Sequence, residues 1–163
     1  MNTPLDIDKS FEIFRSFHND WALVTSGDIS IHNSMTISWG EMGTIWNKPV
    51  VTIYIKPCRY THSFIENNEC FVVSFYDEKY KKALGVMGSK SGRDINKDVE
   101  SGLTPYSYKG LTLYKEAKLS LVCKKIYQND LDINNIPKGA INNHYKVEAP
   151  HTMYIGEVIE IKE

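Results

Sequence analysis

Apolar and hydroxyl-bearing side chains alternate between Ser34 and Trp39. The apolar positions are Met35, Ile37 and Trp39, and the hydroxyl positions are Ser34, Thr36 and Ser38. A period of two places the two kinds of side chain on opposite faces of a β-strand. The segment therefore predicts a strand with one apolar face and one face that can form hydrogen bonds.

Short runs of β-branched and aromatic residues predict further strands. They are expected at Ala22–Thr25, Val50–Ile55, Phe71–Phe75, Leu111–Leu113, Ala117–Tyr127 and Met153–Ile161. Val50–Ile55 is expected to be a central strand, because it is an unbroken β-branched run closed by Lys56 and Pro57. Several short strands at close spacing, with only two or three helices, indicate a mainly β protein with a barrel rather than a parallel sheet.

Three helices are expected between these strands, each from an apolar stripe or a capping pattern. They are Ser10–His18 with Ser10 as its cap, Thr61–Asn68 with the capping pair Ser63 and Glu66, and a helix from Asp77 through Leu84–Met87 that ends at Gly88. The polar stretch from Ser89 to Gly102 is too long and too charged to be a simple turn.

Composition and charge narrow the class of protein. The 163 residues, 42% hydrophobic and 24% charged, fit one soluble domain that spans 1–163. A formal charge of -1 argues against nucleic-acid partners and against recruitment to acidic membranes. The start of the chain has no signal-peptide pattern, and no window approaches the roughly 18 apolar residues of a spanning helix. We therefore expect a cytoplasmic protein.

The three cysteines, Cys58, Cys70 and Cys123, are odd in number and widely spaced. They form no zinc-binding pattern, and free buried thiols are the expectation. The five histidines lack ligand spacing, so no metal site is predicted. Neither the G-x-S-x-G elbow of hydrolases nor the GxGxxG fingerprint of nicotinamide-binding domains occurs. Any nicotinamide would therefore dock on a bound cofactor.

Three segments could hold a planar ligand that carries a phosphate. In the first, the hydroxyls of 34–38 and Trp39 could hold a polar ring edge and cover an apolar face, while Gly40 and Gly43 allow close backbone approach. The alternative is an ordinary barrel strand whose hydroxyls face solvent.

The second segment, Lys56–Thr61, lies between a strand and a helix. The fork of Arg59 suits a phosphate, and Thr61 adds a hydroxyl beside the first amides of the helix. The third segment is Lys90–Asp94 with Lys97, where cations, a hydroxyl and a flexible glycine suit a second anion clamp. The alternatives are an Arg59 paired with a surface carboxylate and a solvated charged loop.

Taken together and in order, these segments resemble the flavin reductase-like family of FMN-binding split barrels, which includes the flavoredoxins. The resemblance covers about Trp21 to Ile161. Its motifs are Asn33-Ser34-Met35-Thr36-Ile37-Ser38-Trp39-Gly40, Trp46-Asn47-Lys48-Pro49, Pro57-Cys58-Arg59-Tyr60-Thr61, Lys90-Ser91-Gly92-Arg93-Asp94 with Lys97, Gly102-Leu103-Thr104, and His151-Thr152-Met153-Tyr154-Ile155-Gly156-Glu157-Val158.

The resemblance implies a homodimer that holds FMN noncovalently at or near the subunit interface. The ring would lie along Met35–Trp39, with Thr36 and Ser38 donating hydrogen bonds to it. The implied cofactor-binding residues are Met35, Thr36, Ile37, Ser38, Trp39, Arg59, Tyr60, Thr61, Lys90, Ser91, Gly92, Arg93 and Lys97. No catalytic side chain is implied, because the flavin carries the redox chemistry.

The favoured function is a flavin reductase, an enzyme that passes hydride from NADH or NADPH to bound FMN. The alternative is a flavoredoxin-like carrier that keeps FMN bound and exchanges electrons with partner proteins without NAD(P)H. A third reading is an FMN-storage or sensing module. The chain is short for the family and has little beyond the barrel that could bind a nicotinamide.

Overall fold

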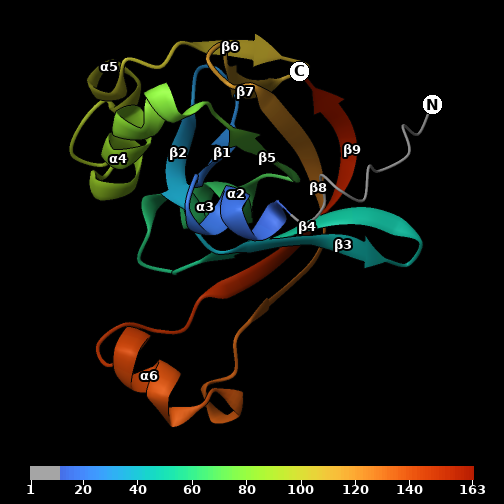
Figure 1. Cartoon of the computed structure of the whole chain (residues 1–163), viewed down its shortest axis with the longest axis vertical. Coiled ribbons are helices and arrows are strands. Elements are labelled where there is room, and N and C mark those ends of the chain that lie inside the picture. The colour runs from blue at the N-terminus through green and yellow to red at the C-terminus, as the bar shows by residue number, and fades with distance from the viewer. Residues whose placement is uncertain (1–11) are drawn as a thin grey trace.

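The computed structural model describes residues 12–163 and is built mainly from antiparallel strands (Figure 1). One sheet has the strand order β2-β1-β5-β8-β9-β4-β3, and β6 pairs with β7 in a separate hairpin. The strands are β1 Ala22–Gly27, β2 His32–Ile37, β3 Gly40–Ile45, β4 Lys48–Ile55, β5 Cys70–Phe75, β6 Pro105–Tyr108, β7 Leu111–Tyr114, β8 Leu119–Asp130 and β9 Thr152–Lys162.

The helices are short, and all but the last of them lie around the sheet (Figure 1). They are α2 Ile13–His18, α3 Tyr60–Asn67, α4 Lys81–Ser89, α5 Lys97–Ser101 and α6 Lys138–His144, with 3-10 turns at Glu78–Tyr80 and Ile133–Asn135. Within residues 12–163, none of these helices has the length and apolar character needed to cross a membrane.

The link between β2 and β3 shows why the sheet is curled. These two strands are the opposite edges of the sheet, yet only Ser38 and Trp39 separate them in the chain. Three Cα–Cα steps span at most about 11 Å, whereas the edges of a flat sheet of this width would lie about 29 Å apart. The sheet must therefore close on itself, with β2 and β3 adjacent but not hydrogen-bonded. The predicted mainly β, split-barrel fold is confirmed.

Both faces of β2 are covered. Its odd-numbered apolar residues, such as Met35 and Ile37, point into the barrel core, and α4 packs on the outer side. Ser34 is only 2% exposed, because α5 and β7 cover it as well. The expected hydroxyl face of this strand therefore lies against other elements rather than in solvent.

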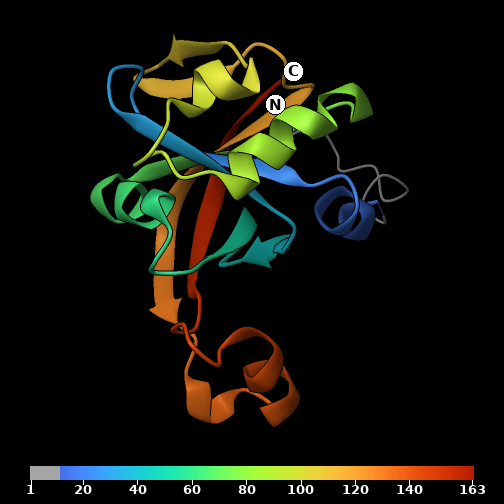
Figure 2. The same cartoon turned by 90° about the vertical axis from the view of Figure 1, so that its left-hand side faces the viewer.

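Strands β8 and β9 continue beyond the barrel and carry a projecting segment, residues 131–151, which we call the arm. The arm contains the Ile133–Asn135 turn and α6, and it extends away from the rest of the molecule (Figures 1 and 2). Its Val147 is 97% exposed. The arm contacts the body of the barrel at its base, through residues 144–151.

Several expected helix boundaries are wrong. The cap of α3 is Arg59 in extended backbone, and the hydroxyl of Ser63 donates to the carbonyl of Tyr60 at 2.9 Å, so no capping box forms. Asp77 precedes a 3-10 turn without a side-chain cap. Gly88 lies inside α4, where a Cβ would approach Thr36 at 3.1 Å, so it serves packing rather than termination.

Some elements carried too weak a pattern to be expected, namely β3, β6, α5 and α6. Helix α5 lies inside the polar stretch 89–102. The side chain of Asn96 caps it, and Gly102 ends it with a φ of 73°. The expected helix Ser10–His18 begins at Ile13 in the structure, and its Ser10 cap lies outside the described residues.

Candidate functional site

Two neighbouring cavities lie beside β2. The first, which we call the basic cavity, has a volume of about 280 Å³. Its wall consists of Asn33, Met35, Cys58, Arg59, Tyr60, Thr61, Met87, Gly88, Ser89, Lys90, Ser91, Gly92, Arg93, Asp94, Lys97 and Glu148. Four of these side chains are cationic and come from the β4–α3 turn, the loop after α4, and α5.

The second, which we call the aromatic cavity, has a volume of about 250 Å³. Its wall consists of Met35, Thr36, Ile37, Ser38, Trp39, Tyr54, Lys56, Arg59 and His151. Met35 and Arg59 belong to both cavities, so the two are adjacent. Together they reach the usual range of ligand pockets, roughly 300–1,000 Å³. Every one of the thirteen residues expected to bind the cofactor lies on one wall or the other.

Arg59 stands where the two cavities meet. Its backbone is extended at the start of α3, and no side chain caps the first amides of that helix. Within residues 12–163, its guanidinium has no hydrogen-bond or ion-pair partner, so the alternative of a surface ion pair is not seen. A free guanidinium beside uncapped helix amides is an arrangement that favours an anion.

The loop after α4 interlocks with this turn. The guanidinium of Arg93 lies 4.8 Å from the ring centre of Tyr60 and donates to the carbonyl of Cys58 at 3.3 Å. A Cβ on Gly92 would stand 2.1 Å from Oδ1 of Asn33. Gly92 is therefore required for close packing against Asn33, which is a different reason from the flexibility expected from the sequence.

Lys97 is a buried cation on the wall of the basic cavity. It is 7% exposed, and its ammonium donates to the carbonyl of Ser34 at 2.6 Å. Burial lowers the pKa of Lys97 to about 8, and the nearby charge of Arg59 acts in the same direction. A negatively charged ligand in this cavity would offset that desolvation, because an opposite charge favours the protonated amine.

The hydroxyl of Thr36 has another partner than expected. It donates to the carbonyl of Leu84 in α4 at 2.6 Å, so its only proton is engaged and its oxygen can still accept. The role of donor to a flavin ring is therefore not available in this arrangement. Gly40 and Gly43 line neither cavity, and a Cβ on Gly40 would stand 2.5 Å from the ring of Phe17.

Trp39 lies in the link after β2 and not in the strand itself. It is 42% exposed, and its ring centre lies 5.0 Å from that of His144 and 5.2 Å from that of His151. Both histidines belong to the base of the arm. The arm thus contributes an edge to the aromatic cavity, which the local sequence around Trp39 does not reveal.

His151 is a neutral histidine in this wall. Burial lowers its pKa to about 4, helped by the charge of Lys56. Its Nδ1 lies 2.7 Å from the hydroxyl of Tyr145, and this contact forms with the single proton of the neutral ring on either nitrogen. His151 was not among the residues expected to bind the cofactor.

Two further charged residues at the site were not among those expected to bind the cofactor, although Lys56 begins the candidate segment Lys56–Thr61. The ammonium of Lys56 forms an ion pair with Glu148 and donates to the carbonyl of His144 at 3.1 Å. Glu148 also lies 3.6 Å from Sγ of Cys58, which is exposed although a buried thiol was expected. These contacts fasten the arm beside both cavities. Their sequence separation of about 90 residues explains why no local pattern signals them.

Comparison with known proteins identifies the family. The model of the flavin reductase like domain matches residues 14–163. An FMN-binding domain of flavin reductase-like enzyme from Shewanella baltica is 22% identical, with a TM-score of 0.66 over 96% of this chain and 74% of that one. The flavoredoxin of Desulfovibrio vulgaris is 21% identical, with a TM-score of 0.67 over 87% and 68%.

A NADH:FAD oxidoreductase from Streptomyces globisporus is 18% identical, with a TM-score of 0.69 over all of this chain and 86% of that one. Proteins with curated descriptions gave no match. These structural likenesses establish the fold, and the match of the family model covers nearly the whole chain. The protein belongs to the flavin reductase-like domain family, as its ordered motifs predicted.

Proposed function

We propose that this protein binds FMN, with the phosphate in the basic cavity and the isoalloxazine ring in the aromatic cavity. The observation that carries the proposal is that the two cavities adjoin at Met35 and Arg59. A ligand with an anionic end and a planar end matches this pair of walls. When bound, FMN would supply the redox chemistry.

The charges of the basic cavity fit one terminal phosphate. Arg59, Lys90, Arg93 and Lys97 contribute four cations, while Asp94 and Glu148 on the same wall are acidic. Charge-assisted bonds from a guanidinium to phosphate are the strong ones. No glycine-rich turn of the dinucleotide-binding type occurs in the sequence to receive a pyrophosphate.

The cofactor can be identified directly. The purified protein, or the protein mixed with FMN and then freed of excess, should release FMN on heating, and chromatography distinguishes FMN from FAD and riboflavin. We expect FMN. Release of FAD, or the absence of any flavin uptake, contradicts the proposed ligand.

We further propose that the protein is an oxidoreductase in which NADH or NADPH reduces the bound flavin. The aromatic cavity supports this interpretation, because Trp39 is partly exposed and the neutral ring of His151 on the cavity wall can hydrogen-bond to a second ligand. The competing function is an electron carrier that serves partner proteins. It is favoured by the same exposed tryptophan, which a protein surface could cover.

Anaerobic mixing separates these two functions. The yellow protein is mixed with NADH or NADPH while its visible flavin absorbance is followed. Rapid bleaching by either nucleotide supports the reductase. Bleaching by dithionite alone supports the carrier and rules out the reductase.

A homodimer is also proposed. Ile159 and Ile161 of β9 are 53% and 57% exposed, and Trp46 is 61% exposed in the β3–β4 turn. Apolar surface of this kind is commonly covered by a second copy. Light scattering should report about twice the monomer mass of 18.7 kDa.

Since the three cysteines form no disulfide, a reducing cytoplasm is the proposed location.

A further inference from the structure

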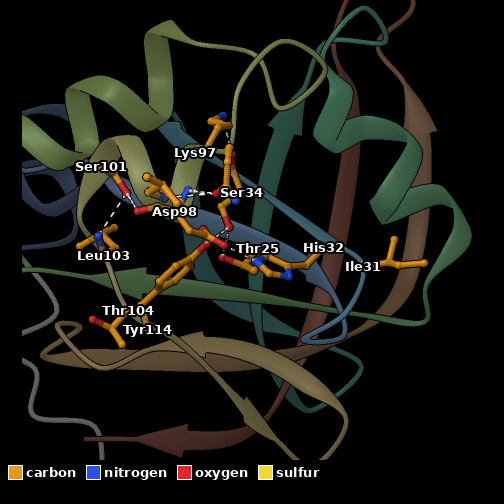
Figure 3. A network of polar contacts seen from close by, with 12 residues as sticks. Thr25, Ile31, His32, Ser34, Lys97, Asp98, Ser101, Leu103, Thr104 and Tyr114 are labelled. Atoms are coloured by element: carbon orange, nitrogen blue, oxygen red, sulfur yellow. Dashed lines mark hydrogen bonds and ion pairs between the residues drawn. The ribbon is translucent and has the colours of Figure 1, made fainter.

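Asp98 of α5 lies at the centre of a polar network behind the basic cavity (Figure 3). One carboxylate oxygen accepts from Nε2 of His32 at 2.9 Å, and the other accepts from the hydroxyl of Tyr114 at 2.6 Å. His32 begins β2 and Tyr114 ends β7. The carboxylate therefore ties a five-residue helix to two separate strands.

The network continues from Tyr114 to the residue that holds Lys97. Figure 3 shows the hydroxyl of Tyr114 beside Oγ of Ser34, at 2.9 Å, and the backbone carbonyl of Ser34 accepts from the ammonium of Lys97 at 2.6 Å. Oγ of Ser34 also lies 2.9 Å from the hydroxyl of Thr25. Ser34 is therefore held in place through both its side chain and its backbone carbonyl.

The contact between His32 and Asp98 is a charged one. Nδ1 of His32 lies 3.0 Å from the backbone carbonyl of Asp28, and Nε2 lies against the carboxylate of Asp98. Both partners can only accept, so both ring nitrogens carry protons and the ring is an imidazolium. Accordingly, the hydrogen bond to Asp98 raises the pKa of His32. Burial works to raise the pKa of Asp98, but its two donors outweigh burial and lower it.

Helix α5 depends on such contacts for its position. Isolated helices shorter than about 12 residues are marginal in water, and α5 has five residues. Asn96 caps it locally, but that cap does not connect the helix to the barrel. Asp98 is adjacent in sequence to Lys97, so a bond at Asp98 also restricts where the neighbouring ammonium can lie.

We propose that Asp98 is a positioning residue: by binding His32 and Tyr114 it holds α5 against the barrel and fixes the ammonium of Lys97 on the wall of the anion site. Asp98 lines neither cavity, so it acts through Lys97 and does not touch the ligand. The inference rests on the proposed phosphate site for its consequence in binding. The position of Lys97 itself can be tested without any flavin.

The first test compares Asp98→Asn with Glu100→Gln. Glu100 is an exposed residue of the same helix, and its substitution removes the same charge. Asp98→Asn should weaken FMN about tenfold and leave riboflavin, which lacks the phosphate, within about twofold. Glu100→Gln should change neither. An equal loss of both ligands in Asp98→Asn would mean a general structural role and would overturn the proposal.

A double-mutant cycle shows whether Asp98 acts through Lys97. Lys97→Met removes the ammonium but keeps an unbranched side chain. In that background, Asp98→Asn should have almost no further effect on FMN affinity, because coupled residues are not additive. A full tenfold loss in the Lys97→Met background contradicts the proposed route.

The second test measures Lys97 in the protein without flavin. A limiting amount of acetic anhydride is added, and mass spectrometry compares acetylation of Lys97 with that of the exposed Lys90. Asp98→Asn should raise the relative rate at Lys97 by at least about threefold, since local opening exposes the amine. Glu100→Gln should leave it unchanged. An unchanged rate in Asp98→Asn overturns the proposal.

Tyr114→Phe provides a milder variant should Asp98→Asn fold poorly. It removes one of the two donors to Asp98 and keeps the buried ring. FMN affinity should therefore fall, and the acetylation rate of Lys97 should rise, by smaller factors than in Asp98→Asn. If neither the affinity nor the rate changes, the proposal is overturned. If wild type binds no FMN, the proposed function fails, and the acetylation result alone decides the role of Asp98.

Discussion

The basic and aromatic cavities are neighbours, but they are built in different ways. The basic cavity is formed by a turn, a loop and a short helix that come together through Gly92, Arg93 and Lys97. The aromatic cavity lies along β2 and its link to β3, and it is completed by Trp39 and by His151 at the base of the arm. The first cavity gathers four cations, whereas the second combines apolar and aromatic side chains such as Ile37, Trp39 and Tyr54 with hydroxyl and charged ones.

Because the two cavities are built differently, their contributions to the binding free energy can be measured separately. Charge recognition depends on a few groups, so a single substitution should remove much of it. Contacts along a planar ring are spread over many atoms, each worth little. FMN and riboflavin share the ring and differ in the phosphate. The difference between their affinities therefore measures what the proposed phosphate site contributes to binding.

The largest effect is expected from Arg59→Ala. Loss of a bidentate bond between guanidinium and phosphate, worth roughly 1.5–3 kcal/mol, should weaken FMN about ten- to a hundredfold. Riboflavin should bind almost as well as before, and Arg59→Lys should recover part of the loss, because it keeps the charge without the fork. Titration of flavin fluorescence gives each affinity.

The control for this substitution is Lys82→Ala, which removes an exposed cation on α4 outside both cavities. It should leave both affinities unchanged. Equal weakening of FMN and riboflavin by Arg59→Ala would show that Arg59, which borders both cavities, supports the ring or the fold instead of the phosphate.

Gly92→Ala should disturb the basic cavity through a change in packing. The new Cβ would stand 2.1 Å from Oδ1 of Asn33, so the loop must move away and carry Arg93 with it. We expect a loss of stability of about 1–3 kcal/mol and a weaker FMN complex. Thermal unfolding and flavin titration measure the two effects. In Gly139→Ala, where no atom lies within 4 Å of the new Cβ, neither should fall.

The pH dependence of FMN affinity should reflect Lys97. Its pKa is lowered to about 8, so the ammonium that attracts a phosphate is lost as pH rises through that value. A phosphate monoester loses its second charge below about pH 6. FMN affinity should therefore be highest between these values and fall by up to about tenfold above them. Titrations of riboflavin, and of FMN with Lys97→Met, should be nearly flat above pH 8.

The smallest effect concerns stability and the aromatic cavity. Burial lowers the pKa of His151 to about 4, from an ordinary value near 6.5 in the unfolded chain. The unfolded state therefore binds the proton more readily, and stability is lost as pH falls from about 6.5 towards 4. A pKa lowered from 6.5 to about 4 corresponds to about 3 kcal/mol at most, and we expect about 1 kcal/mol, because solvent screens the neighbouring charges that contribute to the lowering. Thermal unfolding of His151→Gln should show a smaller decline over that window than wild type.

The residues that line the basic cavity could be selected from the sequence, because each of its parts is a short local motif. Arg59 follows the rigid Lys56–Pro57 end of a strand, and the cations of 90–97 lie within a few residues of one another. Their meeting required the fold, but the residue types at each position already indicated an anion. All of the strands that were expected are present, with ends shifted by a few residues.

The aromatic cavity was harder to predict, since its wall combines β2 with Tyr54 and Lys56 and with His151, which lies more than 100 positions later. Nothing near Trp39 in sequence indicates that His151 lies 5.2 Å from its ring. The alternation at 34–38 correctly predicted a strand, but it could not show that α4 would accept the hydroxyl proton of Thr36. Hydroxyl side chains at a strand surface bind whichever acceptor packs on them, and that choice is made by tertiary contacts.

Strand β9 has a consequence for the order in which the chain can fold. It is inserted between β8 and β4, with Val50 opposite Glu157 and Leu121 opposite Ile161. Without it, the described strands of the large sheet form two separate pieces, β2-β1-β5-β8 and β4-β3. During synthesis from the ribosome, these pieces can form early but cannot be joined until the segment 152–162 has emerged. The aromatic cavity draws its wall from both pieces, Met35 and Ile37 from β2 and Tyr54 from β4, so this part of the binding site forms only after the two pieces are joined.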